Sequence, residues 1–171
     1  MKLELLYHPN ELLATTCEEW NVENPPMDPL ELKAVLFEHM KKFGGIGLSA
    51  NQVGLPYRVF ALQNNSTNNI REREMLAINP AVDEVLGDDV DMWESCLSIP
   101  DVMLNVKRPH KIKASWTNEK GVRRTETLAG YTARVFLHEL DHLNGISMNE
   151  RVSPIEWKEA VATAEAKKKH A

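Results

Sequence analysis

The sequence has few cysteines and no long apolar run, and both absences restrict the class of protein. Its two cysteines, Cys17 and Cys96, are far apart, so they do not form the spacing pattern of a disulfide-stapled secreted domain. No apolar stretch approaches the roughly 20 residues that a bilayer-spanning helix needs. We therefore expect neither a disulfide framework nor a membrane segment.

The sequence also lacks an excess of positive charge and a targeting segment. The formal net charge is −5 at pH 7, which argues against a general nucleic-acid binder and predicts no DNA partner. Residues 1–9 contain neither the apolar stretch of a signal peptide nor the Arg- and Ser-rich composition of a transit peptide. A cytoplasmic protein is the simplest expectation.

No internal repeat, linker or low-complexity block divides the 171 residues. This length suits one domain with a full core and is short for two. We expect a single domain over residues 1–171, with an irregular N-terminal segment over 1–27 and a C-terminal helix over 153–169. Ser153, Pro154 and Glu156 form a capping box with proline at the first helical position, which predicts the start of that last helix.

Between these ends the apolar pattern predicts helices and strands. Asp28 is a good N-cap before Pro29, and apolar residues then recur at helical spacing until Gly44. Pro80 is expected between strands, because proline is disfavoured in central strands. A second, largely apolar helix is predicted over 131–143. The predicted strands cover residues 57–62, 75–79, 81–86, 90–93, 102–106, 111–117 and 122–128.

The helix predicted over 131–143 contains two histidines four positions apart. On a helix, His138 and His142 point to the same side and can share a metal ion, and Glu139 lies beside the first of them. The alternative is a helix with two surface histidines. A helix that is apolar on most sides should be buried, and buried imidazoles without partners are costly, so the metal interpretation is favoured.

A catalytic metal needs a third protein ligand, and the sequence offers two kinds. Downstream, Met148 stands where the extended zinc-peptidase pattern has its third histidine, so only a carboxylate such as Glu159 or Glu165 remains for a zinc endopeptidase. Upstream, Cys96 lies between two predicted strands. Taken alone, a single cysteine is more often a small buried hydrophobe.

Three segments together resemble the signature motifs of the peptide deformylase family. They are Gly45–Gln52 (GIGLSANQ), Glu94–Ser98 (ESCLS) and His138–His142 (HELDH), in the family's order. The resemblance extends from the first helix to Pro154. It implies an α+β fold in which antiparallel or mixed sheets pack around a central buried helix that carries His138–His142, with an N-terminal and a C-terminal helix.

The resemblance implies an enzyme that removes the N-formyl group from the N-terminal methionine of newly synthesised polypeptides and releases formate. Cys96, His138 and His142 would bind one metal ion per chain. Iron(II), Fe²⁺, is the expected metal, and Zn²⁺, Ni²⁺ or Co²⁺ can substitute. A thiolate with two imidazoles gives a singly positive centre, which can polarise the formyl oxygen and lower the pKa of water.

The same resemblance assigns catalytic roles to three further residues. Glu139 would move a proton from the water to the leaving amine. The side-chain amide of Gln52 and the backbone N–H of Leu97 would donate to the oxyanion of the tetrahedral intermediate. Asp141 would support the metal ligands from behind, with Arg108 as its partner.

The resemblance also implies a set of substrate contacts along the methionine pocket. Several of these side chains could equally serve core packing, and Glu94 and Arg134 could pair at the pocket wall. The set comprises Gly45, Ile46, Gly47, Met92, Glu94, Ser95, Tyr131, Arg134 and Val135.

Three positions depart from the family's common pattern. Ser49 replaces an alanine, Ser95 replaces the glycine before the cysteine, and Met103 replaces the arginine of many bacterial members. A Cβ at position 95 would be strained if the backbone there required a positive φ.

The expected partners are N-formylmethionyl nascent peptides, and we expect a monomer. A non-catalytic binder of formylated N-termini is a further alternative, although such a binder has no need of Glu139. The lysines at 167–169 suit either ribosome contact through the C-terminal helix or a solvated helix that closes the domain.

Overall fold

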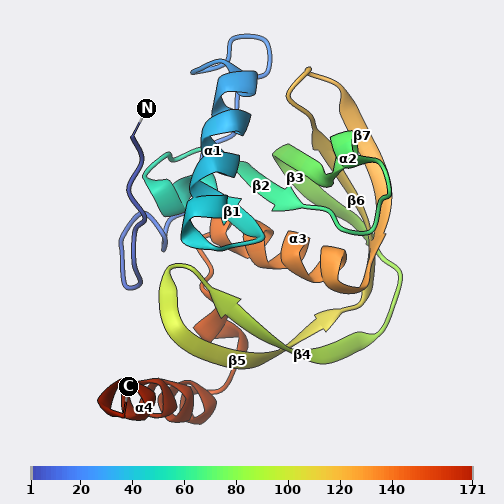
Figure 1. The fold of residues 1–171 in the computed structure, drawn as a ribbon. Coiled ribbons are helices and arrows are strands. Elements are labelled where there is room, and N and C mark those ends of the chain that lie inside the picture. The colour runs from blue at the N-terminus through green and yellow to red at the C-terminus, as the bar shows by residue number, and fades with distance from the viewer. Residues whose placement is uncertain (1, 171) are drawn as a thin grey trace.

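The computed structural model describes residues 2–170 and has two antiparallel sheets (Figure 1). The smaller sheet is the hairpin of β4 (Asp89–Cys96) and β5 (Ile99–Pro109). The larger sheet has the order β1-β2-β3-β6-β7, formed by β1 (Gly47–Ser49), β2 (Val59–Gln63), β3 (Glu74–Val85), β6 (Lys111–Thr117) and β7 (Arg123–Ala129).

The helices begin and end at residues with clear capping roles. The Asp28 side chain accepts a hydrogen bond of 2.9 Å from the backbone N–H of Leu30, and Gly44 ends the first helix with φ 74°. Ser153 caps the last helix through the N–H of Glu156. The predicted start and end of the first helix and the predicted start of the last helix are all confirmed. The helices are α1 (Pro29–Phe43), α2 (Ile70–Arg73), α3 (Gly130–Leu143) and α4 (Pro154–Lys169), with 3-10 helices η1 (Ala50–Val53) and η2 (Met148–Arg151).

The expected break at Pro80 is wrong, because β3 runs through this proline as one strand. Pairing of β3 with β2 ends at Ile78, and its pairing with β6 shifts register between Ile78 and Ala81. A β-bulge therefore surrounds Pro80, so its missing N–H interrupts no regular ladder bond. Every strand pair among residues 2–170 is antiparallel, and parallel pairing is confined to an isolated bridge between Glu18 and Tyr57.

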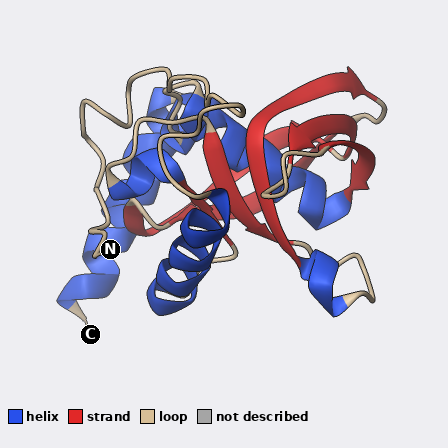
Figure 2. Ribbon diagram, turned by 90° about the horizontal axis from the view of Figure 1, so that it is seen from above, coloured by secondary structure: helices blue, strands red, loops and turns tan. Residues whose placement is uncertain are grey.

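The α3 helix lies between the larger sheet and the β4–β5 hairpin (Figure 1). Its Phe136 packs edge-to-face on Phe60 of β2, with ring centroids 5.1 Å apart, and also contacts Trp116 of β6. The α4 helix packs on β5 through Trp157, Ala160 and Ala164. Seen from above, the strands twist strongly past one another, and the two chain ends lie on the same side (Figure 2).

Within residues 2–170, no helix combines the length and the apolar character that a membrane crossing requires.

Candidate metal centre

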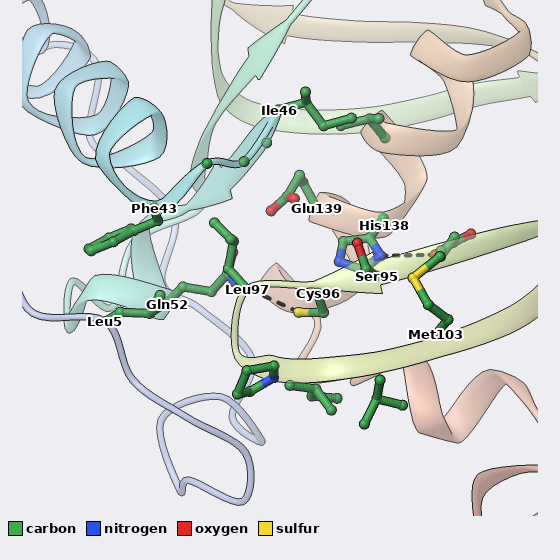
Figure 3. Close-up of a pocket in the computed structure, with 18 of the residues that line it drawn as sticks. Leu5, Phe43, Ile46, Gln52, Ser95, Cys96, Leu97, Met103, His138 and Glu139 are labelled. Atoms are coloured by element: carbon green, nitrogen blue, oxygen red, sulfur yellow. Dashed lines mark hydrogen bonds and ion pairs between the residues drawn. The ribbon is translucent and has the colours of Figure 1, made fainter. Parts of the chain in front are cut away.

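A cysteine from β4 and two histidines from α3 converge below the larger sheet. The potential ligand atoms of Cys96, His138 and His142 all lie within 4.8 Å of one another, and all three residues are buried. Cys96 Sγ is 3.3 Å from His142 Nε2. Because the two histidines are one helical turn apart, both rings reach toward the same point (Figure 3 shows His138 beside Cys96).

The β4–β5 hairpin determines the position of Cys96. Along β4 the side chains alternate, so Glu94 and Cys96 are buried whereas Trp93 and Ser95, on the other face, are exposed. A register shift follows Ser95, and Cys96 then pairs directly with Ile99 across a tight turn. The thiol therefore points toward α3 from the last position of its strand.

These three side chains fit a divalent metal ion. His138 Nδ1 is engaged by Glu94 at 2.9 Å, which leaves Nε2 free to bind a metal. In tetrahedral coordination, metal–sulfur and metal–nitrogen bonds of about 2.3 and 2.1 Å separate the two ligand atoms by about 3.5 Å. The 3.3 Å between Cys96 Sγ and His142 Nε2 is close to this value. One thiolate with two imidazoles is a donor set suited to iron(II) or zinc.

Behind His138, Glu94 is held by two arginines. Its carboxylate accepts from Arg108 Nε at 2.7 Å and from Arg134 Nη1 at 2.5 Å, in addition to its contact with His138. Although burial opposes it, hydrogen bonds from His138 and Arg108 lower the pKa of Glu94 to about 2. Glu94 is therefore a fixed negative charge that orients the His138 ring.

The network extends to the far side of α3 through Asp141. Arg108 Nη1 donates to its carboxylate at 2.7 Å, and Arg151 of η2 donates to it at 2.5 and 2.9 Å. The two arginines thus share Asp141 between them. Arg108, which also binds Glu94, connects both acids into one buried cluster.

The surroundings of Glu139 differ from those of Glu94. It is 4 % exposed, and its Oε2 has no hydrogen-bond partner among the described residues. Burial raises the pKa of Glu139 to about 7, against the opposing charge of His138. A Cβ added at Gly47 would lie 2.6 Å from Glu139 Oε1, so this glycine leaves room for the carboxylate. Such a carboxyl group is suited to accept and return a proton.

Gln52 and Leu97 lie on the other side of Cys96 (Figure 3). The Gln52 side-chain nitrogen faces Cys96 Sγ at 3.8 Å and donates to Ser98 Oγ at 3.0 Å. Leu97 follows the cysteine in the turn between β4 and β5 and is half-buried. Both residues line the same cavity as Glu139 and His138.

This cavity has a volume of about 610 Å³ and opens to solvent beside the metal-ligand cluster. Met92, which is expected along the methionine pocket, is not among the residues that line this cavity. Met92 shares the buried face of β4 with Glu94, but it lies one pleat further from Cys96, beyond the cavity. The predicted contact residues that do line it are Gly45, Ile46, Gly47, Glu94, Ser95, Tyr131, Arg134 and Val135.

Ser95 does not adopt a positive φ, so the concern about its backbone does not hold. Among the described residues other than glycine, positive φ occurs only at Asn79 and Asp101. The side chain of Ser95 points into the cavity near His138 (Figure 3). A serine therefore fits this strand without strain.

Sequence reasoning missed the roles of two residues near the cavity, Trp93 and Ser98. Trp93, which is 64 % exposed, and Met103 form an apolar rim at its mouth. Strand alternation could have identified Trp93, because it lies on the same face of β4 as Ser95. Ser98 was within a recognised motif, but its hydrogen bond to Gln52 depends on the fold.

Comparisons with known proteins agree on one family. Residues 2–158 match the family model described as polypeptide deformylase. The chain is 37 % identical to the peptide deformylase of Thermotoga petrophila over 119 residues, which are 70 % of this chain and 69 % of that protein. It is 33 % identical to the peptide deformylase of Aquifex aeolicus over 162 residues, covering 95 % of this chain and 93 % of that protein.

A similar solved structure is that of a peptide deformylase from Synechococcus elongatus in complex with actinonin. Its TM-score with this chain is 0.82 at 29 % sequence identity, covering 95 % of this chain and 86 % of that chain. The similarity thus includes both the fold and the sequence.

Proposed function

This chain belongs to the polypeptide deformylase family, and on this premise we propose that Cys96, His138 and His142 hold one catalytic iron(II). The chain is a metal-dependent hydrolase that removes the N-formyl group from the N-terminal methionine of new polypeptides. The observation that carries the assignment of residues is a buried Cys-His-His cluster beside an unpartnered carboxylate in one cavity. Zn²⁺, Ni²⁺ or Co²⁺ could replace the iron.

When bound, the metal supplies Lewis-acid polarisation of the formyl carbonyl and lowers the pKa of water. Glu139 accepts the proton of the attacking water and delivers a proton to the amine that leaves. Its buried position and its unused Oε2 suit both steps, because the carboxyl group is free to exchange a proton with the reactants.

The oxyanion of the tetrahedral intermediate lies within reach of the Gln52 amide and the Leu97 backbone N–H. Both donors are positioned before substrate binds, Gln52 by its hydrogen bonds and Leu97 by the β4–β5 turn. Removing one such donor typically costs about 3–4 kcal/mol of transition-state stabilisation.

Substrate enters along β1, which is an edge strand of the larger sheet. Gly45 and Gly47 line the cavity beside this edge, so an extended peptide backbone can approach closely and pair with it. The methionine side chain packs in the part of the cavity lined by Ile46, Tyr131 and Val135. Glu94 and Arg134 form the wall there and are already paired with each other.

The structure does not support the zinc endopeptidase alternative, because neither of its candidate carboxylate ligands lies near the cluster. Glu159 and Glu165 lie exposed on α4, which packs on β5, and neither lines the cavity of the cluster. Replacing Cys96 with serine separates the two activities. A deformylase should lose most of its metal and activity, whereas a peptidase with a carboxylate ligand should keep its metal.

The direct test is formate release from formyl-Met-Ala-Ser by anaerobically prepared, iron(II)-loaded protein. We expect turnover with iron(II). No turnover with iron, nickel or zinc would exclude the enzyme and leave the non-catalytic binder of formylated N-termini.

We also propose that the 171 residues act as one catalytic domain and as a cytoplasmic monomer. In this domain α4 closes the small core that also contains Val102 and Leu104 of β5. Lys167, Lys168 and Lys169 are exposed at its end and can contact the ribosome transiently. Light scattering tests the monomer. Co-sedimentation with ribosomes, compared with a variant carrying alanine at all three lysines, tests the contact.

A further inference from the structure

Ser49 is joined to Gln52 by two hydrogen bonds. Its backbone N–H and its hydroxyl group both donate to Gln52 Oε1, each at 3.0 Å. Ser49 ends β1 and precedes η1, which carries Gln52 three residues later. Ser49 is 0 % exposed and Gln52 1 %, so water does not compete for either bond.

These two bonds use both acceptor positions of the Gln52 carbonyl oxygen. On the other side, one N–H of the Gln52 amide donates to Ser98 Oγ. The second N–H faces Cys96 Sγ at 3.8 Å, too long for a strong bond, and points into the cavity. The amide is therefore clamped at its oxygen and at one hydrogen, and its other hydrogen is available to a ligand.

The hydroxyl group contributes more than orientation. The backbone N–H alone opposes a flip of the amide, because a flipped amide would bring two donors together. A second donor on the same oxygen draws electron density from the amide, and hydrogen bonds in such chains strengthen one another. The N–H that faces the cavity thereby becomes a better donor to a negatively charged oxygen.

We propose that the Ser49 hydroxyl group is a positioning element for the reaction: it holds and polarises the Gln52 amide that stabilises the oxyanion. This inference rests on the proposed function, and it adds a residue that acts through Gln52 without touching substrate. Loss of one hydrogen bond of ordinary strength corresponds to a rate effect of roughly three- to tenfold.

The kinetic test is Ser49→Ala. We expect kcat to fall roughly three- to tenfold with KM nearly unchanged, because the oxyanion exists only in the transition state and the intermediate. Ser115→Ala is the matched control. It also removes a buried serine hydroxyl group with hydrogen-bond partners, Asp83 and Arg123, but Ser115 does not line the cavity, so kcat should not change.

A double-mutant cycle distinguishes positioning from a general structural role. In a Gln52→Leu background, where no amide remains to be polarised, Ser49→Ala should have almost no further effect on kcat. An equal loss of kcat in both backgrounds, or a rise in KM instead of a fall in kcat, would overturn the proposal.

A spectroscopic test needs no activity. Gln52 and Gln63 are the two glutamines of the chain, so zinc-loaded protein labelled with ¹⁵N-glutamine should show two side-chain amides. In Ser49→Ala, the Gln52 amide should exchange with solvent roughly three- to tenfold faster, and half-buried Gln63 should be unchanged. Identical Gln52 exchange in both proteins would refute the role of Ser49. Absence of formate release by wild-type protein would refute only the proposed function.

Discussion

Two buried glutamates, Glu94 and Glu139, line the same cavity but have very different surroundings. Glu94 on β4 is bound by Arg108, Arg134 and His138. Glu139 on α3 lies against Gly47 and has an oxygen without a partner among the described residues. The pKa of Glu94 is lowered to about 2, and that of Glu139 is raised to about 7.

The difference shows how one site can contain a structural acid and a catalytic acid. Burial raises the pKa of both carboxyl groups, and at Glu94 the hydrogen bonds from His138 and Arg108 outweigh that effect. A carboxylate that is always charged can orient a metal ligand but cannot carry a proton at neutral pH. A carboxyl group whose pKa lies near neutrality can do so, and pairs of acids with separated pKa values are typical of acid–base sites.

The largest expected effect is on activity, in Glu139→Gln. The amide keeps the shape of the side chain but cannot take up the proton, so kcat should fall by roughly 10²- to 10⁴-fold. Metal content, measured by atomic emission, should stay at one ion per chain. Formate release at a near-normal rate would show that another group carries the proton.

The corresponding change at Glu94 should instead reduce stability. Glu94→Gln leaves Arg108 and Arg134 buried without their counter-charge, and breaking such a cluster costs about 3–5 kcal/mol. It also weakens the hold on the His138 ring, so metal affinity should fall about 10- to 100-fold. Urea unfolding and competition with a chelator measure the two effects. A variant that is as stable as wild type but inactive would contradict the division of roles.

The sequence predicted helix boundaries better than strand continuity. Asp28, Gly44 and Ser153 act on the backbone within a few residues, so their roles can be read locally. The path of β3 through Pro80 could not be read in this way, because the bulge depends on where β2 stops pairing and β6 shifts.

Within the site, motif resemblance selected the residues that the fold brings together as a ligand cluster. The alternation along β4 can be predicted from the sequence, but the extent of the cavity along the strand cannot, because it depends on how β4 packs against α3 and β1. The shared hold of Arg108 and Arg151 on Asp141 joins β5, α3 and η2. The resemblance already implied Arg108 as a partner of Asp141, whereas the contact of Arg151 follows from packing and has no local sequence signal.

The difference between Glu139 and Glu94 can also be tested by crowding the carboxylate of Glu139. Gly47→Ala would place a Cβ 2.6 Å from Glu139 Oε1 and 2.9 Å from Val135 Cγ1, so the carboxylate must move. Displacing a catalytic group by about 1 Å can cost about 10²-fold in rate, and we expect a loss of roughly 10- to 100-fold in kcat. The metal should remain bound, because no ligand is displaced.

Gly87→Ala is the matched control for this crowding. A Cβ at Gly87 would also meet a side chain, that of the exposed His110, at 2.5 Å, and Gly87 does not line the cavity. Its kcat should stay within a factor of about two, since a flexible exposed ring can move aside. Equal losses in the two variants would attribute the effect to general destabilisation instead of the position of Glu139.

The smallest effect is expected at the outer end of the charged cluster. Arg151 binds Asp141 through two hydrogen bonds, but its side chain is 42 % exposed, so solvent screens the pair. Asp141 also keeps Arg108, which is almost fully buried. Arg151→Ala should therefore lower the free energy of unfolding by less than about 1 kcal/mol, and by still less in 1 M salt, where charges are screened within about 3 Å. Urea unfolding at low and high salt measures the difference. If Arg151→Ala lowers the free energy of unfolding as much as Glu94→Gln does, the charged cluster depends on its exposed member as much as on its buried ones. The surroundings that keep Glu94 charged would then depend on a residue at the protein surface.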